Sequence, residues 1–535
     1  MLNRRNFIAA AAGLSTLPFI GNFVFAASED VKKNAKRGGT LTIAVNPEPP
    51  LLVSAFHSGQ SNGIVSTKIL EGLIAYDTEL NMHPYLAKSW EWSDDGLSLT
   101  FHLQENVKWH DGVPFTSKDV AFTLMNVWKE LHAYGRPAFS NVTAVDTPDE
   151  HTAILRLSAP AKYMMGVFSP YISQILPAHL YEGTDIRANP YNNAPIGTGP
   201  FKFKEWVQGS HVALERNDDY WREDEPYLDG VIFRFMPDAA TRLVAFQSGE
   251  VQLGFASPIP VNELKNLSKS DDFFVTTIGG EYTAPMFLHE LNLRRAPFDN
   301  VKVRQAMLHA INREGLIRVV WGGYGKVAAG PIPSTNTQFF NPNTVQYPYD
   351  PKRAEELLDE AGYPRGKDGV RFTMTHDFLP FGSTLQRSAE YTKQQLGQVG
   401  IKVDIRAQDY ASYMRRIYTD YDFDMTNVYL STMPDPVLGV QRLYWSENIS
   451  PGVPYGNASG YSNPEMDALW ELVQTEVDDE KRREAFFKIQ EIAQRDLPIL
   501  NLFEYQSVTV GSSKVKNFST TAYASFSSLS DVYLD

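Results

Sequence analysis

Short stretches in which apolar and polar residues alternate recur along this chain, and each lies next to a turn or a helix signal. Residues 40–45 show the alternation, and residues 97–103 show it directly after the turn signal Asp95–Gly96. A period of two places one set of side chains on a single face, so both stretches are predicted to be half-buried strands. Residues 401–405 and 423–429 are predicted strands as well. Short strands are therefore expected throughout the chain.

Helices are predicted where a capping residue precedes an apolar stripe. Thr116 stands three residues before Asp119, which resembles a capping box. Asp350–Pro351 supplies an N-cap and a proline for the first turn, and Gly362 is expected to close the same helix. Another helix is predicted over residues 385–399, directly before a predicted strand. Strand, helix and strand in succession predict an α/β lobe.

Length and composition narrow the classes of protein that this chain can belong to. A chain of 535 residues is too long for one hydrophobic core, so two or three domains are expected. The formal charge is −14 and no basic block occurs, which argues against nucleic-acid binding and against attraction to anionic membranes. The chain has no cysteine, which excludes disulfides, thiolate catalysis, cysteine-ligated metals and a lipid anchor on cysteine.

The first 26 residues are predicted to be an export signal peptide. Arg4–Arg5 opens the segment Arg-Arg-Asn-Phe-Ile, which resembles a twin-arginine signal, and an interrupted apolar run follows. Residues 24–26 read Val-Phe-Ala and offer a cleavage site. No later apolar run approaches about 18 residues, so a membrane anchor is not expected.

Signals for catalysis or metal binding are weak. His110–Asp111 has the residue types of a base and its orienting carboxylate, but no nucleophile follows at a known spacing, so a hydrogen-bonded turn is favoured. The 11 histidines show no His-Glu-x-x-His spacing, so neither a metal nor a cofactor is expected. Gly197–Thr198–Gly199 is not a phosphate loop, because Pro200 and a strand follow. Its glycines are expected to fit a tight crossover.

One long segment and several shorter ones resemble a single protein family. Residues 86–120 read LAKSWEWSDDGLSLTFHLQENVKWHDGVPFTSKDV. They resemble a characteristic stretch of the family 5 extracellular solute-binding proteins, which are the dipeptide, oligopeptide and nickel receptors of ABC importers. Residues 71–73, 196–201, 216–221 and 350–363 resemble shorter motifs of that family, in the expected order. The resemblance covers nearly all of the mature chain.

The resemblance implies an α/β fold with the two lobes of a periplasmic binding protein, a hinge between them, and an inserted subdomain in the larger lobe. In this chain, residues 38–75, 196–283 and 500–535 would form the core of lobe I, 76–195 the inserted subdomain, and 284–499 lobe II. It further implies a monomeric periplasmic protein, not an enzyme, which captures a small-molecule ligand by lobe closure and delivers it to the membrane permease subunits of an ABC importer. The alternative, from a different class, is a twin-arginine-exported hydrolase or cofactor enzyme.

The stretch 421–436 is expected to carry the ligand site, because a predicted strand ends there in a loop and ligands of α/β lobes bind at strand ends. In peptide-binding relatives an aspartate of this loop pairs with the amino group of the ligand. The matching residue here is Asp435, which is expected to face a wet cleft when no ligand is bound. The other predicted ligand contacts are Tyr429, Trp445, Phe381 and His57.

The ligand class is narrowed by a missing arginine. Dipeptide-binding relatives clamp the carboxylate of the ligand with an arginine in the loop that matches residues 377–383, and this chain has none there. Arg387 lies further on, inside the predicted helix. Because apolar groups cannot replace a bidentate clamp, a dipeptide is not favoured. A longer peptide, an opine-like conjugate and an oligosaccharide stay open.

Overall fold

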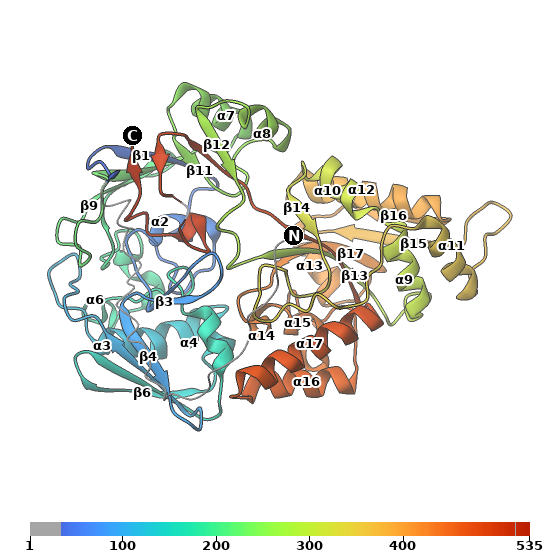
Figure 1. The fold of residues 1–535 in the computed structure, drawn as a ribbon, viewed down its shortest axis with the longest axis horizontal. Helices are drawn as coiled ribbons and strands as arrows, with labels where there is room; N and C mark the ends of the chain where they lie inside the picture. The colour runs from blue at the N-terminus through green and yellow to red at the C-terminus, as the bar shows by residue number, and fades with distance from the viewer. Residues whose placement is uncertain (1–33, 519) are drawn as a thin grey trace, which may run out of the picture.

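The computed structural model describes residues 34–518 and 520–535, and the predicted signal peptide over residues 1–26 lies outside them. Two mixed sheets each form the centre of a lobe, and the two lobes lie side by side (Figure 1). Helices cover the sheets, so the predicted α/β class and two-lobe architecture are confirmed. No helix in the described ranges combines the length and the apolar composition needed to cross a membrane.

The first lobe is built on a seven-stranded sheet in the order β12, β19, β11, β1, β10, β9, β8. Strand β1 runs parallel to its two neighbours, and the outer strands are antiparallel to theirs. Strand β1 spans the predicted residues 40–45, with Leu41, Ile43 and Val45 buried. The bounds are β1 Thr40–Val45, β8 Phe201–Val207, β9 His211–Arg216, β10 Gly230–Phe235, β11 Leu253–Gly254, β12 Phe273–Thr276, β19 Thr509–Ser512, α2 Gln60–Ser66, α7 Ala239–Ser248 and α8 Val261–Leu267.

The segment predicted to be an inserted subdomain lies in the lower part of the first lobe in Figure 1 and has a four-stranded antiparallel sheet in the order β4, β5, β7, β6. Thr116 and Asp119 form the predicted capping box at the start of its first helix. The bounds are β2 Ile74–Tyr76, β3 Met82–Pro84, β4 Ala87–Trp92, β5 Ser98–Leu103, β6 Val142–Asp149, β7 Thr152–Leu157, α3 Ser117–Thr123, α4 Lys129–Leu131, α5 Gly135–Ala138 and α6 Ala178–Tyr181. A 3-10 helix, Lys162–Val167, reaches from this subdomain toward the second lobe.

The second lobe has a six-stranded sheet in the order β14, β18, β13, β17, β15, β16, in which β15 runs parallel to both β16 and β17. The strand bounds are β13 Pro285–Leu291, β14 Gly325–Val327, β15 Phe372–Phe378, β16 Ile401–Arg406, β17 Met425–Ser431 and β18 Ile499–Tyr505. The helix bounds are α9 Val301–Ala310, α10 Arg313–Val320, α11 Pro351–Glu360, α12 Ser383–Gln398, α13 Tyr410–Tyr418, α14 Pro436–Gly439, α15 Gln441–Tyr444, α16 Pro464–Thr475 and α17 Asp479–Asp496. Asp350 caps α11 through the Arg353 N–H, as predicted.

Strand β17 begins two residues later than predicted. The carbonyl groups of Tyr421 and Phe423 accept hydrogen bonds from the Asn292 side chain, at 2.9 and 3.1 Å. These residues therefore bind a side chain instead of a neighbouring strand, and the ladder starts at Met425.

Within the described residues, two segments cross between the lobes. Residues 277–284 lead from β12 to β13, and residues 506–508 lead from β18 to β19. The predicted assignment of 500–535 to the core of lobe I is wrong at its start, because β18 pairs with β13 and β14 in the second sheet. The chain returns to the sheet of the first lobe only at β19.

Three of the sequence motifs meet at one buried carboxylate in the first lobe. Glu71 accepts hydrogen bonds from Thr198 Oγ1 at 2.8 Å, from the Tyr220 hydroxyl at 2.8 Å and from Trp221 Nε1 at 3.0 Å. Burial nevertheless raises the pKa of Glu71, against the opposing effect of Arg222 and these donors. The motifs thus fix the chain segments around 71, 198 and 220 to one another.

The glycines at 197 and 199 fit a close approach of two backbones. A Cβ atom at Gly197 would lie 1.8 Å from the Ile69 carbonyl oxygen, and one at Gly199 would lie 2.6 Å from it. The Gly199 N–H donates to that same oxygen at 2.9 Å. The predicted tight crossover is therefore present, and it joins the inserted subdomain to the core of the first lobe.

Candidate functional site

The carboxyl ends of three neighbouring strands of the second sheet point to the first lobe. Strands β15, β16 and β17 are parallel, so they end at the same edge. At that edge Ser431, the last residue of β17, pairs with Pro285, the first residue of β13. Strand β13 enters directly from the crossover 277–284, so this edge faces the space between the lobes. Open α/β sheets bind ligands at such an edge.

Five aromatic side chains gather at this edge, and we call them the strand-end aromatic group: Phe381, Tyr410, Tyr429, Tyr455 and Tyr505. The rings of Phe381 and Tyr410 stack with centroids 5.2 Å apart. The hydroxyl groups of Tyr410 and Tyr455 lie 3.2 Å apart, and the rings of Tyr429 and Tyr505 lie 6.1 Å apart. Phe381 is 50% exposed, Tyr410 43% and Tyr429 37%, so a bound ligand would find uncovered apolar surface here.

A cavity of about 550 Å³ continues from Tyr505 into the space between α8 of the first lobe and α10 and α12 of the second. The first lobe contributes residues between 257 and 262. The second lobe contributes Arg318 and Arg387 and the first residues of α12. No acidic side chain lines this cavity within the described part of the chain.

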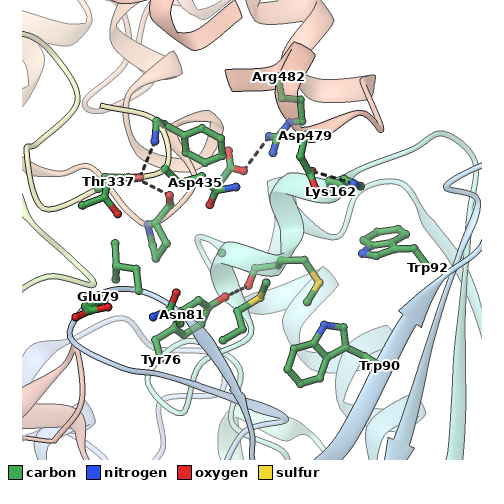
Figure 2. Close-up of a pocket in the computed structure, with 18 residues that line it drawn as sticks. Tyr76, Glu79, Asn81, Trp90, Trp92, Lys162, Thr337, Asp435, Asp479 and Arg482 are labelled. Carbon is green, nitrogen blue, oxygen red and sulfur yellow. Dashed lines mark hydrogen bonds and ion pairs between the residues drawn. The ribbon is translucent and has the colours of Figure 1, made fainter. Parts of the chain in front are cut away.

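A second cavity between the lobes, of about 400 Å³, lies below the strand-end edge and is drawn in Figure 2. The inserted subdomain contributes Trp90, Trp92 and Lys162, and the second lobe contributes Asp435 and Arg482. Asp479, also in its lining, forms an ion pair with Lys162 at 2.9 Å, which crosses from one lobe to the other. Both cations of this cavity are paired with aspartates.

Asp435 is not the open carboxylate that the sequence led us to expect. Its Oδ2 accepts a hydrogen bond from Arg482 Nη2 at 2.8 Å, and its Oδ1 accepts one from the Val437 N–H at 3.1 Å, which caps α14. The Asp435 side chain is only 8% exposed. The prediction of a carboxylate facing a wet cleft is therefore wrong, because the Asp435 carboxylate pairs with Arg482 and is largely buried (Figure 2). Contact of Asp435 with a ligand stays a prediction, and its side chain lines this cavity.

The other predicted ligand contacts fall in different places. Phe381 and Tyr429 belong to the strand-end aromatic group. Trp445 follows α15 and packs against the core of the second lobe. His57 lies on the first lobe, where its Nδ1 accepts a hydrogen bond from the Gly59 N–H at 3.0 Å and burial lowers its pKa. Only the first two of these four residues are brought together.

Sequence reasoning missed several residues of the cleft. Tyr410 follows β16 as Phe381 follows β15, so the strand-end rule was sufficient to find it. Tyr505 ends a strand that was assigned to the other lobe. Arg318 carries no sequence signal, because its position in the cleft depends on how α10 packs against the first lobe.

The His110–Asp111 pair is a structural turn, as predicted. The Gly112 N–H donates to the Trp109 carbonyl at 2.8 Å. His110 Nε2 contacts the Gly199 carbonyl at 2.9 Å, whereas the Asp111 carboxylate contacts His179 Nε2 at 2.7 Å. The two side chains bind different partners and do not form a base with its orienting acid. Across residues 34–518 and 520–535, no three His, Asp or Glu side chains are grouped to hold a metal ion.

Comparison with known proteins agrees with a ligand site between two lobes. The model of the bacterial extracellular solute-binding proteins, family 5, middle region, matches residues 81–451. The chain belongs to this family. This solute-binding protein is 35% identical over 353 residues to the glutathione-binding protein GsiB of Pectobacterium atrosepticum, a match that spans 64% of each chain.

Solved structures similar to this solute-binding protein include complexes with ligands. The periplasmic binding protein DppA of Helicobacter pylori, in complex with the peptide STSA, superposes with a TM-score of 0.75 at 27% identity, over 94% of this chain and 99% of that one. AgaA of A. tumefaciens R10, in complex with agropinic acid, superposes with a TM-score of 0.73 at 27% identity, over 93% of this chain and 99% of that one.

Proposed function

We propose that this protein captures a peptide-like solute that carries a free carboxylate and delivers it to the membrane permease of an ABC importer. The observation that carries the proposal is the strand-end aromatic group, whose uncovered rings lie at the edge of the second sheet that faces the first lobe. The glutathione-binding, peptide-binding and agropinic-acid-binding relatives support this ligand class. Glutathione, short peptides and opines share an amino-acid skeleton and carboxylates.

Capture is expected to work by closure of the lobes. Two crossover segments join them, and each is short enough to act as a hinge. A ligand on the aromatic group would be covered by the facing loops of the first lobe, which removes apolar surface from water. No bond of the solute is made or broken. The predicted signal peptide supports a periplasmic location, where a permease in the inner membrane can receive the loaded protein.

A screen of carboxylate-bearing solutes tests the proposal. Glutathione, tri- and tetrapeptides, opines and neutral oligosaccharides are added to the purified mature protein, and the melting temperature is recorded. A ligand at a hundredfold excess over its Kd stabilises the folded state by about 2.7 kcal/mol. We expect an upward shift with one of the amino-acid-derived solutes, together with a smaller radius of gyration in solution scattering.

Three outcomes contradict different parts of the proposal. An upward shift of the melting temperature with oligosaccharides alone refutes the proposed ligand class. A tight ligand that leaves the radius of gyration unchanged refutes lobe closure. Turnover of a bound solute, or a stoichiometric chromophore or metal in the purified protein, favours the exported enzyme instead.

A further inference from the structure

We propose that Arg318 and Arg387 form an anion-binding end of the cleft, which receives the terminal carboxylate of the ligand. The inference rests on the proposed function and specifies where the charged end of the solute lies. It also replaces the arginine that is missing from the loop 377–383 with two arginines on neighbouring helices.

The two arginines share one wall of the cavity of about 550 Å³. Arg318 lies in the last turn of α10 and Arg387 in the second turn of α12. Arg387 Nη2 donates to the Val319 carbonyl at 3.3 Å, which ties α12 to the end of α10. The opposite wall belongs to the first lobe, so a group bound between the walls contacts both lobes and favours their closure.

Neither guanidinium has an anionic partner in the part of the chain that the structure describes. No carboxylate oxygen lies within 4.0 Å of Arg318 or Arg387 there, although most arginines around the second sheet are paired. The lining of the cavity from the first lobe is neutral: Ser257, Ile259, Pro260, Val261 and Asn262. The cavity therefore holds two uncompensated positive charges, whereas the cations of the cavity in Figure 2 are paired with aspartates.

The N-terminus of α12 adds to the positive electrostatic potential in the cavity. This helix has 16 residues, no side-chain cap at its start and no acidic residue in its first turn. Ser383 and Thr384, at that start, line the cavity. The positive end of the helix dipole thus lies at the cavity that both arginines line. A carboxylate there can accept paired hydrogen bonds from an arginine fork.

The position of the arginines bears on the length of ligand that the proposal favours. Tyr505 belongs to the strand-end aromatic group and also lines the cavity, so the two regions share this residue. Arg387 lies a full turn inside α12, beyond the loop in which dipeptide receptors place their clamp. A solute that contacts Tyr429 and Arg387 together must therefore extend past the strand ends. We therefore expect a tripeptide or a conjugate of similar length to bind more tightly than a dipeptide.

Calorimetric titration with matched ligands tests the inference. The probes are reduced glutathione, tri-alanine and tetra-alanine, and for each the analogue whose terminal carboxylate is an amide. Arg318→Ala, Arg387→Ala and the double variant are compared with Lys393→Ala, a control on an exposed position of α12 outside the cavity. Loss of one charged hydrogen-bonding partner is expected to lower the binding affinity for the free acid by about 10- to 100-fold. The amide should bind the wild-type protein as weakly as the free acid binds the double variant.

The outcomes separate the inference from the function on which it rests. Both arginines are exposed, so the melting temperature of the unliganded variants should stay within about 1 °C of the wild type. If a free acid binds and the double variant retains its affinity, the arginine pair is refuted and the function stands. If the amide and the acid bind the wild type equally, the pair is refuted as well. If none of the probes binds, the peptide-length ligand and the arginine pair that would hold it are refuted together, and the opines of the thermal screen decide the function.

Discussion

Replacing Asp435 with asparagine should destabilise the second lobe even when no ligand is present. The substitution keeps the shape of the side chain and the cap on α14, since the amide oxygen still accepts from the Val437 N–H. It removes the negative charge that Arg482 contacts at 2.8 Å, with the two side chains 8% and 4% exposed. Breaking a buried pair by removing one partner costs about 3–5 kcal/mol, and the retained cap places the expected loss near 3 kcal/mol.

The change is large enough to read from a melting curve. For a folding unit of about 150–250 residues, each kcal/mol shifts the midpoint by roughly 2–4 °C, so the second-lobe transition should fall by about 6–12 °C. Differential scanning calorimetry of the unliganded protein resolves the two lobes if they melt separately. The first-lobe transition serves as an internal control, because Asp435 and Arg482 both lie in the second lobe.

A double variant identifies the cause. Arg482 also donates to the Val473 carbonyl at 2.9 Å and lies over the Phe339 ring, 5.6 Å from its centroid. Methionine preserves much of that packing, so Asp435→Asn with Arg482→Met should recover at least half of the lost stability, because no unpaired charge stays buried. A single variant that melts within 1 °C of the wild type and loses ligand affinity would refute this reasoning. It would support Asp435 as a ligand contact.

Three further outcomes are expected. Glu71→Ala leaves two buried donors and one partly buried donor without their acceptor, so chemical denaturation should show the first lobe destabilised by at least about 3 kcal/mol. An unchanged midpoint would contradict the role given to this carboxylate. His376 is fully buried with both ring nitrogens unpartnered among the described residues, and burial lowers its pKa and that of neighbouring His289, to about 3 for the latter. Below a pH of about 6.5 the unfolded state therefore binds protons that the folded state does not, so the stability of the wild-type protein should fall as the pH drops from 6.5 toward 3. His376→Leu should raise the stability by about 1–3 kcal/mol at neutral pH and make its fall with pH less steep. Urea titrations between pH 4 and 7 can check both expectations. Phe381→Ala removes a half-exposed ring from the stack with Tyr410, so it should lower ligand affinity at least fivefold while the melting temperature changes by less than about 2 °C; equal losses in both would make the ring structural.

Local chemistry explains which parts of the fold could be predicted from the sequence. The capping box of Thr116 and Asp119 and the cap of Asp350 were found because a cap acts within three residues of chain. Strand β1 was found because alternation needs only one buried face. Each signal is complete within the segment that carries it, so no knowledge of the rest of the molecule is required.

The site depended on contacts that no segment contains. Asp435 was correctly placed in a loop after a strand, but its partner Arg482 lies 47 residues away on another helix. Strand β18 was assigned to the wrong lobe because a mostly apolar strand does not indicate which sheet it joins. Phe381 and Tyr429 were predicted by the strand-end rule, whereas Arg318 came within reach only through the packing of α10 against the first lobe.

The place of β19 in the first sheet dictates the order in which the chain can finish folding. This strand lies between β12 and β11, and its residues, 509–512, follow every strand of the second sheet in the chain. All six strands of the second sheet lie between residues 285 and 505. The lobe that starts first on the ribosome therefore closes its sheet last. A chain truncated before β19 would carry a complete second lobe and a first lobe with a missing inner strand, whose two flanking edges expose unpaired backbone to other chains.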